Sequence, residues 1–220
     1  MPDQQSDSHP VRIAVIGNYI PRRCGIATFT TDLAESLAAE SPESEVWAAA
    51  MNDVPEGYSY PSRVHFEMNQ QSRGDYQLAA EFLNINGVQV ASLQHEYGIF
   101  GGPAGGFILD LIGRLRMPVV TTLRTIVREP TLDHINVTSE IARLSAKLVV
   151  MSRRAAGFLR DIYKVPEEKI RVHPPWDPQP PLRRPQLLQG PIPGRGPDCR
   201  YHLRVALAQQ GHRAHDHRHA

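Results

Sequence analysis

Short runs of β-branched and other apolar residues alternate along the chain with segments in which apolar residues recur at helical spacing. The run at 11–16 is typical of a buried strand. The segment 26–39 that follows carries Phe29, Leu33 and Leu37 on one face, which predicts an amphipathic helix. Further strands are expected at 45–50, 63–68, 88–93, 118–123, 148–151 and 169–172. Further helices are expected at 76–83, 107–115, 132–144 and 153–163.

This alternation predicts the fold class. Strands that are apolar throughout and joined by helices form a mainly parallel sheet with helices on both faces. We therefore expect one Rossmann-like α/β domain over residues 11–172. Ligands of such open sheets bind beside the carboxyl ends of the strands. The candidate site is therefore formed by the loops that follow Ile16, Leu93, Leu123 and Met151.

The first of these loops, residues 17–25, carries two candidates for binding an anion. A glycine at position 25 would let backbone N–H groups approach an anion at the positive end of the helix. Arg23, beside Arg22, adds positive charge suited to phosphate. The loop contains neither G-x-G-x-x-G nor a P-loop, so it lacks a dinucleotide or ATP signature. The alternative is that Gly25 only makes a tight turn and that the arginines are solvated.

The loop after Leu93 gives the strongest indication of a site, because His95, Glu96, Tyr97 and Gly98 follow the strand directly. His95 and Glu96 are suited to act on a substrate hydroxyl, and the glycines of the loop leave room for a ligand. The alternative is a buried histidine with a satisfied hydrogen bond, and glycines that serve helix packing. We favour the binding site, because the end of a parallel strand is where ligands bind.

The two remaining loops contribute one candidate each. Arg124 follows the strand at 118–123 and is suited to bind an anion. Ser152 precedes the helix at 153–163, where it is expected to act as an N-cap and where a ligand could also approach. The ordinary alternative for Ser152 is the N-cap alone.

Composition divides the chain after Val172. The 220 residues carry a formal charge of only +1, so no strong field attracts nucleic acid. Residues 173–220 hold seven arginines, no lysine, three aspartates, 9 of the 19 prolines and 6 of the 10 histidines. They show no sustained periodicity, so we expect a disordered segment there, as we do for residues 1–10.

Composition also excludes several classes of protein. Cys24 and Cys199 make no disulfide framework, which favours a reducing compartment. No apolar run approaches the ~20 residues that span a bilayer, and the polar amino terminus lacks a signal-peptide core. No metal site is expected, because no cluster of ligands has supporting partners. We therefore expect a cytoplasmic protein with no transmembrane segment and no nucleic-acid partner.

Five segments resemble the amino-terminal half of bacterial family 4 glycosyltransferases. They are YIPRRCGIATFT (19–30), LQHEYGIFGG (93–102), PVVTTL (118–123), LVVMS (148–152) and VPEEKIRV (165–172). The first two are specific and the others are generic. The resemblance implies the GT-B architecture, in which two Rossmann-like domains face each other across a cleft. The first domain mostly binds the acceptor, and the second binds the nucleotide-sugar donor.

The resemblance also implies roles for individual positions. Gly25 would face the donor phosphates, and His95 with its loop would line the acceptor side. Relatives usually have a histidine where this chain has Arg124, so the role of that histidine is in doubt here. No cofactor is implied. The nucleotide sugar is a co-substrate, the acceptor is a sugar or polyol, and transfer would retain configuration without an obligatory metal.

The segment after Val172 departs from the family. Relatives continue with a segment close to IPHGIP, whereas this chain has HPPWDP at 173–178. Codons for these residues, read one base later, permit IPHGIP. The same shifted frame permits family-like strings from residues 181–189 and 203–214. We therefore expect a frameshift after Val172, natural or from sequencing, and the alternative is a genuine segment rich in proline and histidine.

These observations predict a sugar transferase by family that lacks its donor-binding domain. Transfer needs the donor and the acceptor held together, so we expect the chain alone to be inactive and to bind a nucleotide sugar only if a second domain is supplied. The alternative is a stand-alone Rossmann-like module that binds a carbohydrate or an anion without catalysis.

Overall fold

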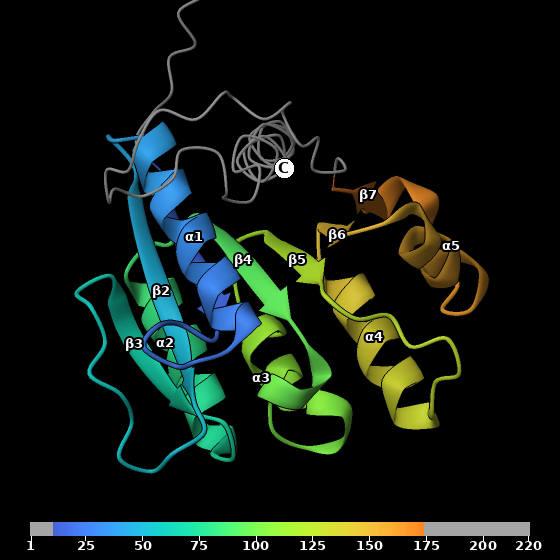
Figure 1. Ribbon diagram of the computed structural model, residues 1–220, viewed down its shortest axis with the longest axis horizontal. Coiled ribbons are helices and arrows are strands. Elements are labelled where there is room, and N and C mark those ends of the chain that lie inside the picture. Colours follow the sequence, from blue (N-terminus) through green and yellow to red (C-terminus); the bar gives the residue numbers. More distant parts are fainter. Residues whose placement is uncertain (1–10, 174–220) are drawn as a thin grey trace, which may run out of the picture.

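The computed structural model describes residues 11–173, which form one α/β domain (Figure 1). Its strands are β1 (Arg12–Gly17), β2 (Glu45–Asn52), β3 (Val64–Asn69), β4 (Val90–His95), β5 (Val119–Leu123), β6 (Lys147–Val150) and β7 (Ile170–Val172). Its α-helices are α1 (Gly25–Glu40), α2 (Arg73–Ile85), α3 (Ile108–Ile112), α4 (Leu132–Leu144) and α5 (Arg153–Asp161). Short 3-10 helices are η1 (Tyr97–Ile99), η2 (Pro103–Gly105) and η3 (Glu167–Lys169).

The strands form a single seven-stranded sheet in the order β3-β2-β1-β4-β5-β6-β7. Every adjacent pair of strands is parallel. The first six strands follow the order of the dinucleotide-binding folds, in which the chain winds outward from β1 in one direction and then from β4 in the other. The predicted Rossmann-like α/β class is confirmed, and the sheet is parallel throughout.

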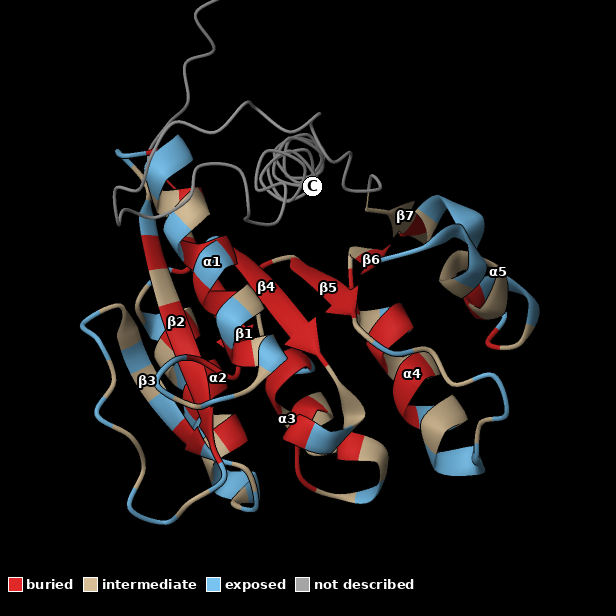
Figure 2. Ribbon diagram, viewed as in Figure 1, coloured by how far each residue is buried: buried red, intermediate tan, exposed pale blue. Residues whose placement is uncertain are grey.

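Helices cover both faces of the sheet, as expected. On one face α1 packs Leu33, Ala34 and Leu37 against strand residues such as Val15 and Val90. The helices α2 to α5 belong to a larger apolar cluster on the other face, to which they contribute Tyr76, Ala79, Leu83, Leu111, Ile141 and Leu159 among others. The central strands are buried along most of their length (Figure 2). Burial on both faces explains why these strands are apolar throughout rather than alternating.

The predicted elements differ from the observed ones mainly at their ends. The helix expected at 107–115 is only Ile108–Ile112, because it ends at Gly113, a residue that disfavours helical backbone. The backbone N–H of His173 donates to the carbonyl of Val150 at 2.8 Å, so the β6–β7 pairing extends one residue past the predicted domain boundary. The disorder expected for residues 1–10 and the frameshifted segment expected after Val172 lie outside the described residues.

Within residues 11–173, no helix combines the length and the apolar character needed to cross a membrane.

Candidate functional site

The carboxyl ends of all seven strands lie at one edge of the sheet, and the order of winding reverses between β1 and β4. This reversal separates the loops of adjacent strands and is where ligands of such sheets bind. The two strands approach closely there. A Cβ atom placed on Gly17 would lie 3.2 Å from the Cβ atom of Gln94.

The loop after β1 leads into α1 through an unusual cap. The Sγ atom of Cys24 accepts hydrogen bonds from the backbone N–H of Ala27 and from Nδ2 of Asn18, both at 3.3 Å. Gly25, the first residue of α1, is exposed, and no atom lies within 4 Å of the position that a Cβ would occupy. The φ angle of Gly25 is not positive. Neither packing nor backbone conformation among the described residues therefore requires glycine at position 25.

The two arginines of this loop have different surroundings. Arg22 donates from Nη1 to Oδ1 of Asn18 at 3.0 Å and forms an ion pair with Asp53 at 3.1 Å, so it links the loops after β1 and β2. Arg23, the predicted ligand contact, is exposed next to Gly25. Its role in binding stays a prediction.

His95 is the last residue of β4 and is completely buried. Its ring stacks on Phe100, with centroids 5.6 Å apart, and meets the ring of Tyr97 edge-on at 5.1 Å. Neither ring nitrogen has a hydrogen-bond partner among the described residues. Burial lowers the pKa of His95 to about 3, because the charged form loses its hydration. The imidazole is therefore neutral near pH 7 and is enclosed in this conformation, and its contact with substrate stays a prediction.

The residues after His95 connect the loop to neighbouring elements. Oε2 of Glu96 accepts a hydrogen bond from Oγ1 of Thr125 at 2.6 Å, which joins the loops after β4 and β5. The hydroxyl of Tyr97 shares a hydrogen bond of 2.7 Å with Oγ1 of Thr138 on α4. Gly98 is exposed, and no atom lies within 4 Å of its Cβ position.

The glycines of this loop fall into two groups. A Cβ on Gly101 would collide with the carbonyl oxygen of Gln70, and one on Gly102 would lie 2.7 Å from the ring of Phe107. Gly105 has a φ of +73° and would meet the carbonyl oxygen of Tyr97 at 2.7 Å. These three glycines are explained by packing, the alternative stated for them above. Gly98 has no such constraint, so open space lies beside it.

Arg124 follows β5 and reaches toward α1. Its guanidinium carbon lies 4.1 Å from the centroid of the Phe29 ring. Its Nη1 atom is buried without a hydrogen-bond partner among the described residues. Burial lowers the pKa of Arg124, and the charge of Glu96 opposes that shift. His95 and Arg124 are neighbours along the strand ends, but their side chains lie on opposite faces of the sheet.

Ser152 is the N-cap of α5, as predicted. Its Oγ accepts a hydrogen bond from the backbone N–H of Ala155 at 3.1 Å. Ser152 is exposed, and its carbonyl also accepts from the backbone N–H of Ala156 at 3.2 Å. Its predicted role in substrate binding stays a prediction.

Sequence reasoning missed two polar residues of this edge. Gln94 and Thr122 are fully buried, and Gln94 Oε1 and Thr122 Oγ1 lack hydrogen-bond partners in the described part of the chain. The available signal was the presence of polar side chains in the last positions of otherwise apolar strands.

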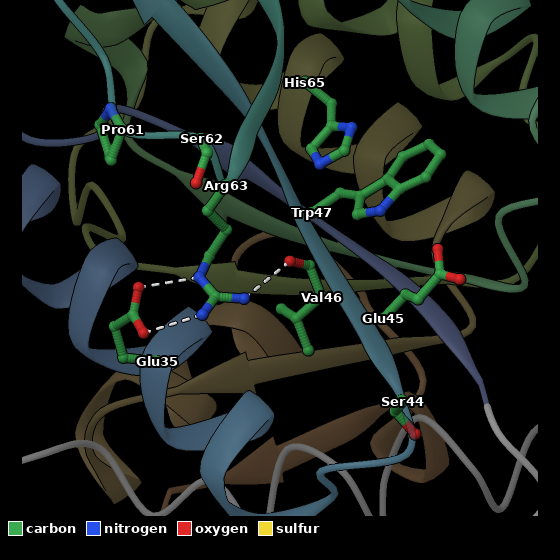
Figure 3. A pocket seen from close by; sticks show the side chains of 9 residues that line it. All are labelled: Glu35, Ser44, Glu45, Val46, Trp47, Pro61, Ser62, Arg63 and His65. Carbon is green, nitrogen blue, oxygen red and sulfur yellow. Dashed lines mark hydrogen bonds and ion pairs between the residues drawn. The ribbon is translucent and has the colours of Figure 1, made fainter.

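The described surface also has a groove of about 450 Å³ away from the strand ends, at the start of β2 (Figure 3). Arg63 makes a two-pronged contact with Glu35 there, at 2.8 and 2.9 Å, and donates to the carbonyl of Val46. His65 stacks on Trp47 with centroids 4.3 Å apart. The charged and aromatic groups of the groove thus already have partners. Across residues 11–173, no group of three or more histidine, cysteine or acidic side chains is placed to hold a metal ion.

No family model and no curated protein matches this sequence. Solved structures do match the fold. The apo form of the lipopolysaccharide outer core galactosyltransferase WaaB aligns with a TM-score of 0.51 and 9% identity, over 74% of this chain and 45% of its own. A glycosyltransferase from Rickettsia africae ESF-5 aligns with a TM-score of 0.49 and 14% identity, over 74% of this chain and 42% of its own. The chain therefore spans less than half the length of these structures. The fold of residues 11–173 resembles part of the WaaB galactosyltransferase structure.

Proposed function

We propose that residues 11–172 are the acceptor-side half of a GT-B sugar transferase. The observation that carries this proposal is the match of the sheet to part of the WaaB galactosyltransferase, together with polar side chains at the ends of β1, β4 and β5. Three of the five segments that resemble family 4 enzymes, 19–30, 93–102 and 118–123, lie at the ends of these strands.

Gly25 is the proposed contact for the phosphates of a nucleotide-sugar donor. The open space at its Cβ position and the absence of an acidic residue in the first turn of α1 support this role. The positive end of a helix favours an anion, and a glycine lets the anion approach the backbone. His95, Glu96, Tyr97 and Gly98 form the proposed acceptor side, with Gly98 beside open space.

Transfer requires a second domain to bind the nucleotide sugar and to stabilise the departing diphosphate. We therefore propose that the described domain alone gives little or no turnover. A donor domain supplied in the same or another polypeptide would complete the site. Robust turnover of common sugar nucleotides by this chain alone would contradict this part of the proposal.

The donor contact is tested by replacing Gly25 with alanine and measuring the affinity of UDP-glucose by calorimetry, with a donor domain supplied. The variant should fold normally, because its Cβ meets no described atom, and should bind the nucleotide sugar at least tenfold more weakly. Gly157→Ala on α5 is the matched control, since its Cβ position is also open. Equal affinities of the Gly25→Ala and Gly157→Ala proteins for UDP-glucose would show that Gly25 does not contact the donor.

The second candidate is a module that binds a carbohydrate or an anion without chemistry. The complete burial and low pKa of His95 favour it, because a group so hard to protonate is a weak base near pH 7. Supplying a donor domain distinguishes the two candidate functions. A transferase gains turnover, whereas a binding module gains none.

The change of reading frame after Val172 is part of the same proposal and lies outside the described residues. Resequencing the gene around codon 172 tests it. If the sequence there contains no extra or missing base relative to a full-length relative, the frameshift is excluded. The segment after Val172 is then a genuine one, rich in proline and histidine.

A further inference from the structure

Five buried polar atoms near the ends of β4 and β5 lack a hydrogen-bond partner within residues 11–173. Two are the ring nitrogens of His95, and the other three belong to the side chains of Arg124 (Nη1), Gln94 (Oε1) and Thr122 (Oγ1). Gln94 and Thr122 are completely buried. Buried polar atoms in folded proteins are nearly always paired, so unpaired atoms gathered in one region indicate a partner still to be supplied.

The side chains of Arg124, Gln94 and Thr122 share one face of the sheet. Gln94 and Thr122 are register partners in the β4–β5 pairing, and register partners in a parallel sheet project to the same side. Arg124 comes two residues after Thr122 and returns to that side, where its guanidinium lies over Phe29 of α1. Gln94 also lies on the α1 side, because Gly17 approaches both Gln94 and Thr30 of α1.

The positive charge of Arg124 is not balanced by an ion pair in the described residues. Glu96, whose charge acts on Arg124, already accepts hydrogen bonds from Thr125 and from the backbone N–H of Tyr97. A half-buried cation that forms no ion pair is stabilised by an anion that reaches it.

We propose that the strand ends bind an acidic sugar, with its carboxylate or phosphate on Arg124 and its hydroxyls on Gln94 and Thr122. This inference rests on the proposed sugar-binding function and adds the charge of the ligand. A guanidinium binds either anion through two parallel N–H donors, and amide and hydroxyl side chains bind sugar hydroxyls. A histidine at position 124 would carry the needed charge only at acid pH, whereas arginine keeps it at every physiological pH.

The test titrates the full chain with a panel of neutral hexoses, their 6-phosphates and their uronic acids, based on glucose, galactose and mannose. Affinities are measured by calorimetry at constant ionic strength. At least one acidic sugar should bind tenfold or more tightly than its neutral counterpart. Preference for the uronic acid identifies a carboxylate ligand, and preference for the 6-phosphate identifies a phosphate ligand. Inorganic phosphate that binds as tightly as the sugar phosphate would overturn the proposed hydroxyl contacts.

Variants separate a specific contact from a general effect of charge. Arg124→Gln should abolish the preference for the acidic sugar over its neutral counterpart, and Arg124→Lys should retain part of that preference. Arg128→Gln is the matched control, because Arg128 is exposed on the same loop and its loss changes the net charge equally. Equal losses in the Arg124→Gln and Arg128→Gln proteins would overturn the inference.

The wild-type titration distinguishes the two levels of the proposal even if a variant fails to fold. Neutral sugars that bind as tightly as their acidic counterparts would overturn the acidic-sugar inference and leave the proposed sugar binding in place. A chain that binds no sugar of either kind would overturn both.

Discussion

The hydroxyl of Tyr97, in the loop after β4, shares a hydrogen bond of 2.7 Å with the hydroxyl of Thr138 on α4. The two residues are 41 positions apart in sequence, so this bond ties the candidate acceptor loop to a helix formed much later in the chain. Thr138 is completely buried. The position of the loop therefore depends on a contact inside the domain.

Replacing Tyr97 with phenylalanine should lower the free energy of unfolding by about 1 kcal/mol, because the buried hydroxyl of Thr138 loses its partner. Urea denaturation measures the change. In a double-mutant cycle, adding Thr138→Val should recover part of the loss, since no unpaired hydroxyl then remains. Fully additive effects would show that the two hydroxyls do not interact.

The glycines of the same loop should differ in their tolerance of a side chain. Gly101→Ala should destabilise the domain by about 1–3 kcal/mol, because the new methyl group meets the carbonyl of Gln70 and the ring of Phe107. Gly98→Ala should leave stability nearly unchanged, since its Cβ position is open. Thermal unfolding of the two variants checks the difference, and similar losses in both would contradict the described packing.

His95 should make the domain less stable in acid. Its pKa is about 3 in the folded state and 6.5 ordinarily, so the unfolded chain binds the proton more tightly. The stability that comes from neutral His95 is present above pH 6.5 and is lost as the pH falls toward 3, by up to about 1.4 kcal/mol per pH unit. Urea unfolding between pH 7 and pH 4 measures this slope. The His95→Leu protein should show a smaller slope of stability against pH. An unchanged slope would show that another group binds the proton.

Ser152→Ala should destabilise the domain by about 1 kcal/mol, because α5 loses its N-cap. Ser152→Asp should restore most of the loss, since a carboxylate caps equally well and suits the positive end of the helix. Guanidinium unfolding compares the three proteins. If neither substitution alters stability, the cap contributes little and the role of Ser152 must be sought in binding.

Much of the fold could be predicted from local patterns. Helix α4 has the bounds that periodicity predicts, Leu132–Leu144, and the Ser152 cap could be identified because a short polar residue precedes the helix. The central strands β1, β4 and β5 could be predicted because strands buried on both faces are largely apolar. The end of α3 at Gly113 and the 3-10 turn at Pro103–Gly105 depend on contacts within the folded loop, so periodicity alone does not predict them.

The arrangement of the site was less predictable. Sequence reasoning assigned His95 and Arg124 to one edge of the sheet, and the backbone N–H of Arg124 does donate to the carbonyl of His95 at 3.0 Å. It did not predict that the two side chains lie on opposite faces of the sheet. His95 contacts Phe100 on one face, and Arg124 contacts Phe29 on the other. The face that each side chain reaches depends on strand register and on the helix that covers it, which are properties of the assembled sheet.

Arg124 stands just beyond Leu123, where β5 ends, and the bond that its backbone makes to His95 does not depend on its side chain. An exchange of arginine for histidine at this position therefore leaves this hydrogen bond of the sheet intact. In a sheet whose strands all run the same way, every strand offers such a terminal position at the same edge. Single substitutions at these terminal positions can therefore change ligand preference during evolution with little effect on the folding of the domain.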